Sequence, residues 1–94
     1  MTRPGTCYLK TTPEIQERIS RLHPAIKKKI KDAVQTILKD HDIGKPLRNE
    51  LEGLRSLRAG KFRMVYRFDK PKTVSIIAFG PRKTIYEETL RLLG

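Results

Sequence analysis

The sequence is poor in several residue types, and each scarcity narrows the possible functions. Of its 94 residues, only Cys7 is a cysteine and none is a tryptophan. A single cysteine excludes a disulfide within the chain and a zinc site built from cysteines. The longest unbroken apolar run has four residues, 76–79, so no segment is predicted to span a membrane. The start MTRPGTCYLK lacks the apolar stretch of a signal peptide, and we expect a cytoplasmic protein.

Acidic residues are scarce relative to basic ones. The chain has 10 acidic residues against 21 lysines and arginines, which gives a formal net charge of +11. Self-repulsion of that size costs stability, and a strongly basic domain typically binds nucleic acid. A basic protein balanced by an acidic protein partner is the alternative, and the two are compatible. The length and the apolar fraction of 37% indicate one compact domain over residues 1–94.

Periodicity predicts two helices in the first half of the chain, after a short edge strand at residues 6–10. The first helix follows Thr12, which can cap it, and the second begins near Pro24. The run KKKIK in the second helix could bind phosphates, although such a run is more often a solvated face. Residues 40–53 contain glycine and proline at several positions and are predicted to form a long loop.

Three strands and a closing helix are predicted in the second half. The strands lie at residues 54–58, 61–68 and 73–79, and the last is expected to be central because it has apolar residues on both faces. Residues 83–94 have helical spacing. The predicted fold class is α+β, with an antiparallel, mixed-edge, four-stranded sheet, two N-terminal helices on one face and a short C-terminal helix (β-α-α-β-β-β-α). The other face of the sheet is expected to be partly open.

The strand GKFRMVYRF alternates apolar side chains on one face with basic ones on the other. If Gly60 and Lys61 form a two-residue turn, Arg58 lies directly opposite Arg63. Like charges so placed are destabilising unless an anion lies between them, so this face is a candidate anion site. The alternative is that both side chains extend into water. Strand alternation places the Arg55 side chain on the opposite face, together with Leu57. Arg55 would reach the basic face only if a bulge intervened or if it lay beyond the end of the strand.

A second group of candidate residues follows the last strand. Tyr86 lies four residues after Arg82, on the same side of the closing helix. Nearby arginines would favour its phenolate and lower its pKa, as suits a general base. The alternative is an ordinary half-buried tyrosine. In this interpretation Arg63 holds the phosphate, and Arg82 or Arg58 stabilises the charge on the leaving oxygen. Together with Tyr86 these residues would suffice to cleave RNA, with its own 2′-hydroxyl as nucleophile and a 2′,3′-cyclic phosphate as product.

Other chemistry has little support in the sequence. His23 and His41 have no metal-ligand neighbour at a recognisable spacing, and Asp40, His41 and Asp42 are merely adjacent residues of a loop. No glycine-rich phosphate loop or nucleophile elbow occurs. We therefore expect neither a metal nor another cofactor.

The stretch LEGLRSLRAGKFRMVYRF followed by VSIIAFGPRKTIY resembles the RelE/ParE superfamily of toxins from bacterial and archaeal toxin–antitoxin systems. The resemblance covers nearly the whole chain as a single RelE-like toxin domain. Similarity to the RelE branch implies an endoribonuclease that cleaves mRNA in the ribosomal A site, contacts ribosomal RNA and inhibits translation. It also implies a cognate antitoxin as partner, with no membrane or small-molecule cofactor.

The resemblance also implies site residues. The family's catalytic positions fall on Arg63, Arg82 and Tyr86, and phosphate contacts are expected from Arg55, Arg58, Lys61 and Lys83. Two departures stand out, because the paired lysines of the RelE branch are replaced by Arg55, Ser56 and Arg58, and a common histidine by Pro81. The proton donor therefore stays open, since arginine is a poor acid. The rival interpretations are a ParE-like, non-enzymatic inhibitor of DNA gyrase and a catalytically inactive relative that binds RNA or antitoxin.

Overall fold

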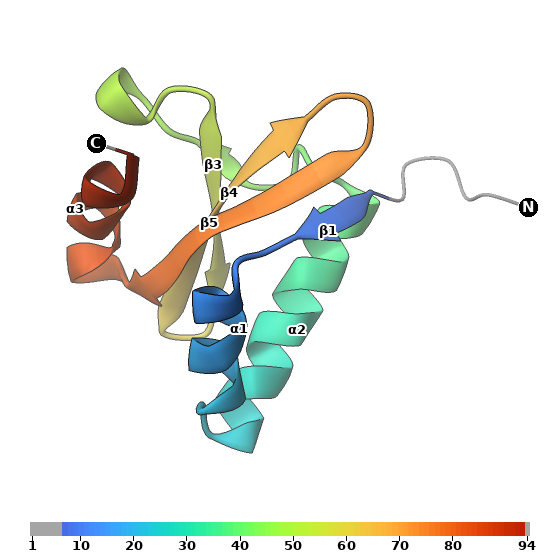
Figure 1. The fold of residues 1–94 in the computed structure, drawn as a ribbon, viewed down its shortest axis with the longest axis vertical. Helices are drawn as coiled ribbons and strands as arrows, with labels where there is room; N and C mark the ends of the chain where they lie inside the picture. The colour runs from blue at the N-terminus through green and yellow to red at the C-terminus, as the bar shows by residue number, and fades with distance from the viewer. Residues whose placement is uncertain (1–6, 94) are drawn as a thin grey trace, which may run out of the picture.

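The computed structural model describes residues 7–93, with the side chains of Arg82, Lys83, Leu92 and Leu93 outside the described set. Its elements are β1 (Tyr8–Lys10), α1 (Pro13–Ser20), α2 (Pro24–Lys39), β2 (Lys45–Pro46), the 3₁₀ helix η1 (Asn49–Leu51), β3 (Leu54–Ala59), β4 (Phe62–Asp69), β5 (Thr73–Pro81) and α3 (Arg82–Leu93). The predicted α+β order is confirmed, with α1 and α2 on one side of the sheet and α3 on the other (Figure 1). The predicted first strand included Thr6, which lies outside the described residues.

Both N-terminal helices begin where the capping signals predict. The Thr12 side chain accepts a hydrogen bond from the Ile15 amide at 3.2 Å, and Pro13 opens α1. At α2, Nδ1 of His23 accepts a hydrogen bond from the Ala25 amide at 3.1 Å. His23 therefore serves as a helix cap.

The sheet has five strands in the order β1-β5-β4-β3-β2, one more than predicted. The additional strand, β2, has only two residues and forms inside the predicted loop. β1 pairs parallel with β5, and the other pairs are antiparallel. β5, which was predicted to be central, is an interior strand that lies between β1 and β4 and is buried on both faces.

The hairpin between β3 and β4 has the predicted register. Arg58 pairs with Arg63, and Gly60 has the positive φ of +64° that the first position of a type II′ turn requires. Arg55 pairs regularly with Tyr66 inside β3, so neither a bulge nor a strand end explains its parity. The bulge lies in β5 instead, where the pairing with β4 skips Ile77.

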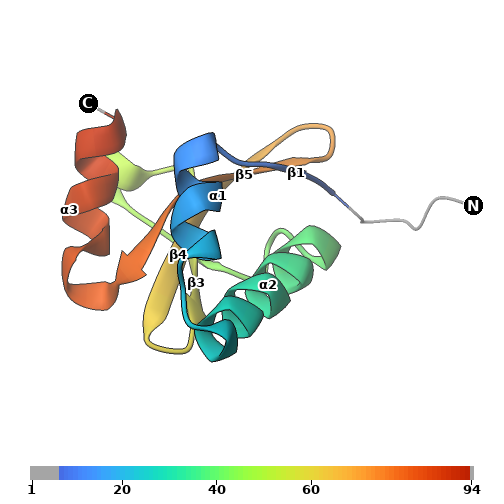
Figure 2. The same cartoon turned by 60° about the horizontal axis from the view of Figure 1, so that its bottom comes forward.

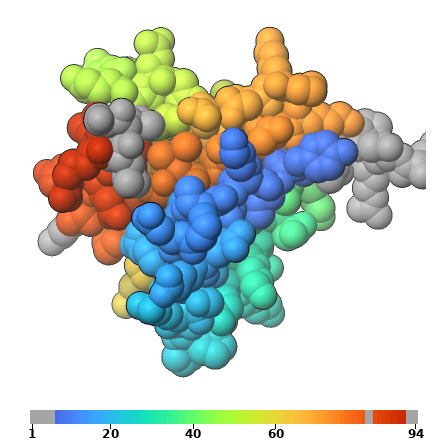
Figure 3. Space-filling view, viewed as in Figure 1, coloured from blue at the N-terminus to red at the C-terminus, as the bar shows by residue number. Residues whose placement is uncertain are grey.

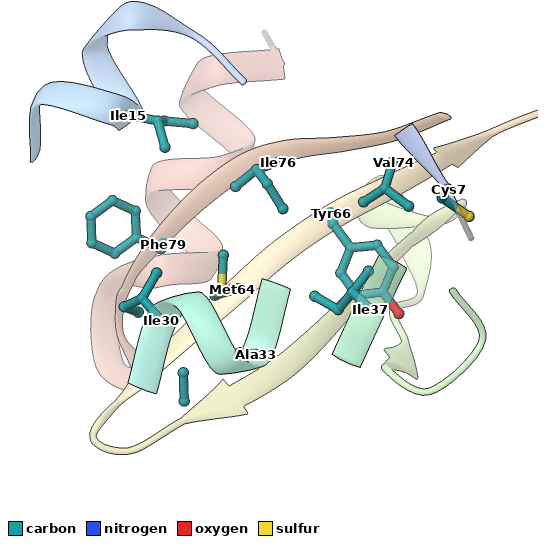
Figure 4. Packing of buried hydrophobic residues seen from close by; sticks show 11 residues of the cluster. Cys7, Ile15, Ile30, Ala33, Ile37, Met64, Tyr66, Val74, Ile76 and Phe79 are labelled. Atoms are coloured by element: carbon teal, nitrogen blue, oxygen red, sulfur yellow. The ribbon is translucent and has the colours of Figure 1, made fainter. Parts of the chain in front are cut away.

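The main core lies between the sheet and helices α1 and α2. Ile30, Ala33 and Ile37 of α2 pack against Met64 and Tyr66, as the close-up shows (Figure 4). A second, smaller cluster lies on the opposite face and consists of Leu51, Leu54, Val65, Ala78 and Ile85. The face that was expected to be partly open is therefore covered at one end by η1 and α3. Figure 2 shows α3 at the left, with α1 and α2 to its right.

Candidate nucleic-acid interface

Arg58 and Arg63 form the centre of the candidate site. They lie directly opposite each other on β3 and β4, which brings their Cβ atoms within about 5 Å. Arg58 is exposed and its Nε donates to the Gly60 carbonyl at 3.1 Å, whereas Arg63 is half-buried. Among the described residues no carboxylate forms an ion pair with either guanidinium. Together with Lys61 they line a hollow of about 100 Å³ that an anion could enter.

Tyr86 reaches the same face from α3. Its hydroxyl lies 3.5 Å from Oγ of Ser56, a buried residue of β3. Ser56 stands two positions from Arg58, so both side chains share a face and are separated by about 6.6 Å along the strand. The structure thus places Tyr86 on the same face of the sheet as Arg58 and Arg63, with Ser56 as its contact on β3.

The end of β5 leads directly into the site. Gly80 pairs with Arg63 and Pro81 with Phe62, so α3 begins beside the hairpin at Arg82. The side chains of Arg82 and Lys83, both predicted site residues, lie outside the described set. The structure therefore places these two residues by their backbone alone, in the first turn of α3.

Arg55, a predicted phosphate-binding residue, is not brought together with Arg58 and Arg63. It lies on the helix-covered face, where Nη1 donates to the carbonyls of Asp42 at 3.1 Å and Gly44 at 2.7 Å. Its Nη2 is 3.5 Å from a carboxylate oxygen of Asp42. The guanidinium therefore fixes the loop before β2.

Tyr66 fixes the same loop from inside the core. Its hydroxyl accepts a hydrogen bond from the Gly44 amide at 2.9 Å and donates one to the His41 carbonyl at 2.7 Å. Burial raises the pKa of the Tyr66 hydroxyl, although the Gly44 amide and the Arg55 charge act in the opposite direction. The His41 ring stacks on Phe68 at 3.6 Å between centroids.

Lys45 and Arg48, which the sequence analysis did not single out, also lie at this face. Lys45 pairs with Ser56, and paired residues of neighbouring strands point to the same side of the sheet. The two cations line a hollow of about 600 Å³ with Pro46, Leu47 and Tyr86. A two-residue strand has no periodicity, so only the fold could reveal this placement.

Neither a metal cluster nor a membrane span is found in the part of the chain that the structure describes. No group of three or more histidine, cysteine, aspartate and glutamate side chains there could hold a metal ion. Within the same residues, every helix is too short or too polar to cross a bilayer.

Residues 9–86 match the family described as the ParE toxin of the type II toxin–antitoxin system, parDE. The chain belongs to the RelE/ParE toxin family of type II toxin–antitoxin systems. Toxin RelE of Mycobacterium tuberculosis is 49% identical to it over 47 residues, a match that covers 49% of this chain and 48% of that protein. The chain thus aligns with about half the length of this curated relative.

Solved structures of family members have the same fold. The toxin–antitoxin complex RelBE2 of M. tuberculosis contains a chain with a TM-score of 0.71 and 27% identity, covering 87% of this chain and 98% of that one. A variant of Escherichia coli RelE in the free state has a TM-score of 0.71 at 18% identity, over 92% and 96% of the two chains. The archaeal RelE–RelB complex of Pyrococcus horikoshii gives 0.66 at 19%, over 82% and 96%. At these identities the last two show the fold alone.

Proposed function

We propose that this domain is a toxin that cleaves mRNA in the ribosomal A site and thereby inhibits translation. The observation that carries the proposal is the opposed pair Arg58 and Arg63, which has no carboxylate ion-pair partner among the described residues. Arg58 lies two residues along β3 from Ser56, whose side chain contacts the Tyr86 hydroxyl. A phosphodiester suits this pair, since guanidinium groups bind phosphate oxygens through paired hydrogen bonds. Ribosomal RNA is the second polyanion that a chain of net charge +11 would contact.

In the proposed reaction the RNA supplies its own nucleophile. Arg63 holds the scissile phosphate, and Tyr86 accepts the proton of the 2′-hydroxyl as its oxygen attacks phosphorus. The bond from phosphorus to the 5′-oxygen breaks, which leaves a 2′,3′-cyclic phosphate and a 5′-hydroxyl. Arg58 or Arg82 neutralises the charge that develops on the leaving side, so the reaction needs no metal to carry that charge.

We also propose that a cognate antitoxin neutralises the toxin. RelE-type chains of M. tuberculosis and P. horikoshii were crystallised with their antitoxins. An acidic, partly disordered antitoxin segment would complement the basic face of this domain and fold on binding. Such a segment would cover Arg58 and Arg63.

Primer extension on cellular mRNAs after brief induction tests the nuclease. We expect new 5′ ends inside coding regions with the unsubstituted chain and none with Arg63→Ala. Arg67→Ala is the matched control, because Arg67 lies on the same face of β4 but is already paired with Asp69 at 3.0 Å. Cleavage by Arg63→Ala at the unsubstituted level would contradict the proposed site.

A ParE-like gyrase inhibitor is the second candidate, because the matching family is described as the ParE toxin. Such a toxin acts through protein contact and requires no catalytic set. Plasmid supercoiling, followed in the same cultures, separates the two functions. Intact mRNAs together with trapped gyrase–DNA breaks would favour the gyrase inhibitor over the nuclease.

A further inference from the structure

The proposed cleavage needs a proton donor that the arginines cannot supply. The 5′-oxygen leaves as a strongly basic alkoxide unless it is protonated while its bond to phosphorus breaks. Arg58 and Arg63 stay protonated in proteins and serve as fixed charges rather than acids. Another side chain on this face must carry a transferable proton.

Lys45 is placed to supply it. β2 pairs Lys45 with Ser56, which lies two positions from Arg58 on the same face and 3.5 Å from the Tyr86 hydroxyl. The lysine backbone is therefore one strand spacing, about 4.8 Å, across the sheet and about 6.6 Å along it from Arg58, and Arg63 lies one strand further. A lysine stem and a bound phosphate together bridge that separation.

The surroundings of Lys45 suit RNA rather than a protein carboxylate. It lines the hollow of about 600 Å³ that Arg48 and Tyr86 also line, with Pro46 and Leu47 as apolar walls. The exposed Lys45 ammonium has no ion-pair partner among residues 7–93 as described. A nucleotide next to the scissile phosphate would place its sugar and base in this hollow.

The backbone on both sides of Lys45 is held in place. Before it, Gly44 is bound through its amide to Tyr66 and through its carbonyl to Arg55. After it, the Leu47 amide donates to the Leu54 carbonyl at 2.9 Å. A general acid needs such a fixed attachment, because proton transfer depends on positioning within hydrogen-bond distance.

We propose that Lys45 is the general acid of this site, an inference that rests on the proposed nuclease function. As the bond between phosphorus and the 5′-oxygen breaks, the Lys45 ammonium transfers one proton to that oxygen and becomes a neutral amine. Tyr86 meanwhile holds the proton taken from the 2′-hydroxyl. Exchange with water then returns Lys45 and Tyr86 to their starting states.

The test compares two messenger RNAs that differ at one atom. Both are bound to ribosomes with the cleavable codon in the A site, and in one the scissile 5′-oxygen is replaced by sulfur. A thiolate leaves without protonation, so the sulfur substrate no longer needs a general acid. Single-turnover cleavage rates are measured for the unsubstituted chain, Lys45→Ala, Lys45→Arg and the control Lys39→Ala, an exposed lysine at the end of α2 and outside the KKKIK run.

We expect Lys45→Ala and Lys45→Arg to lose about 100-fold or more on the oxygen substrate, the range of general acid catalysis. On the sulfur substrate both should stay within about threefold of the unsubstituted chain, which also shows that they fold. Lys39→Ala should match the unsubstituted chain on both substrates.

Two results would overturn the assignment. Equal losses on both substrates would make Lys45 a binding residue, and full activity of Lys45→Arg on the oxygen substrate would reduce it to a positive charge. Failure of the unsubstituted chain to cut either RNA is a different outcome, because it would refute the nuclease function itself.

Discussion

Replacing Tyr66 with phenylalanine should destabilise the domain by removing a single oxygen atom. The Tyr66 ring is fully buried in the main core, so the substitution keeps the packing of the ring. The hydroxyl, however, joins the core to the loop before β2 through the Gly44 amide and the His41 carbonyl. Tyr66→Phe therefore isolates the contribution of that junction.

The size of the loss follows from the burial of the two partners. A hydrogen bond contributes about 1 kcal/mol net, and a buried donor left without a partner costs about 1–3 kcal/mol. Gly44 is buried, whereas His41 is half-exposed and its carbonyl can accept from water. We expect a total loss of about 2–3 kcal/mol, which lowers the Tm of a domain of this size by about 10–20 °C.

Urea unfolding measures the loss directly. The transition midpoint should fall while the slope m stays unchanged, because the surface exposed on unfolding is the same. Tyr8→Phe is the matched control, since Tyr8 is 73% exposed on the edge strand β1 and its substitution should change stability by less than about 0.5 kcal/mol. A loss below about 0.5 kcal/mol in Tyr66→Phe would refute the idea that this hydroxyl anchors the loop.

Two further predictions test electrostatic contributions. Burial raises the pKa of the Tyr66 hydroxyl above its usual value of about 10. The stabilisation that this hydroxyl provides is therefore complete below pH 10 and is lost as pH rises through the folded-state pKa. The difference in unfolding free energy between the unsubstituted chain and Tyr66→Phe should narrow above about pH 10, and a constant difference would contradict this. Arg18→Ala should cost about 1–2 kcal/mol in urea unfolding, because Arg18 pairs with Glu88 at 3.2 Å, donates to the Phe79 carbonyl at 3.3 Å and lies over the Phe79 ring. Arg21→Ala removes only an exposed ion pair and should cost less than about 0.5 kcal/mol, so equal losses would contradict the assignment.

The parts of the fold that follow local rules were predictable from the sequence. The register that opposes Arg58 and Arg63 follows from one glycine at the turn and the alternation of the flanking residues. The starts of α1 and α2 follow from Thr12 and from the prolines that succeed the caps. Each of these signals acts over a few neighbouring residues, where no tertiary contact is needed.

The parts that depend on tertiary contact were not predictable. The face of Arg55 follows from its position in β3, but its partners are carbonyls of a loop whose path is itself set by Tyr66. Lys45 reaches the site only because that path brings two residues alongside β3. The bulge that skips Ile77 was likewise not predicted, because the alternation of residues along β5 gives no sign of it.

The division of the sheet into two faces explains how the domain tolerates its opposed arginines. The larger core lies on the face packed on α1 and α2. The space-filling view shows α3 beside β5 at the left of the molecule (Figure 3). Like charges in opposed positions cost only about 0.2–1 kcal/mol, which such a core can offset. Because Arg63 and Arg58 contribute charge rather than core packing, removing one should not unfold the domain, and an anion bound between them should stabilise it by linkage. Arg58 and Arg63 therefore slightly lower the stability of the free toxin and raise it once an anionic partner is bound.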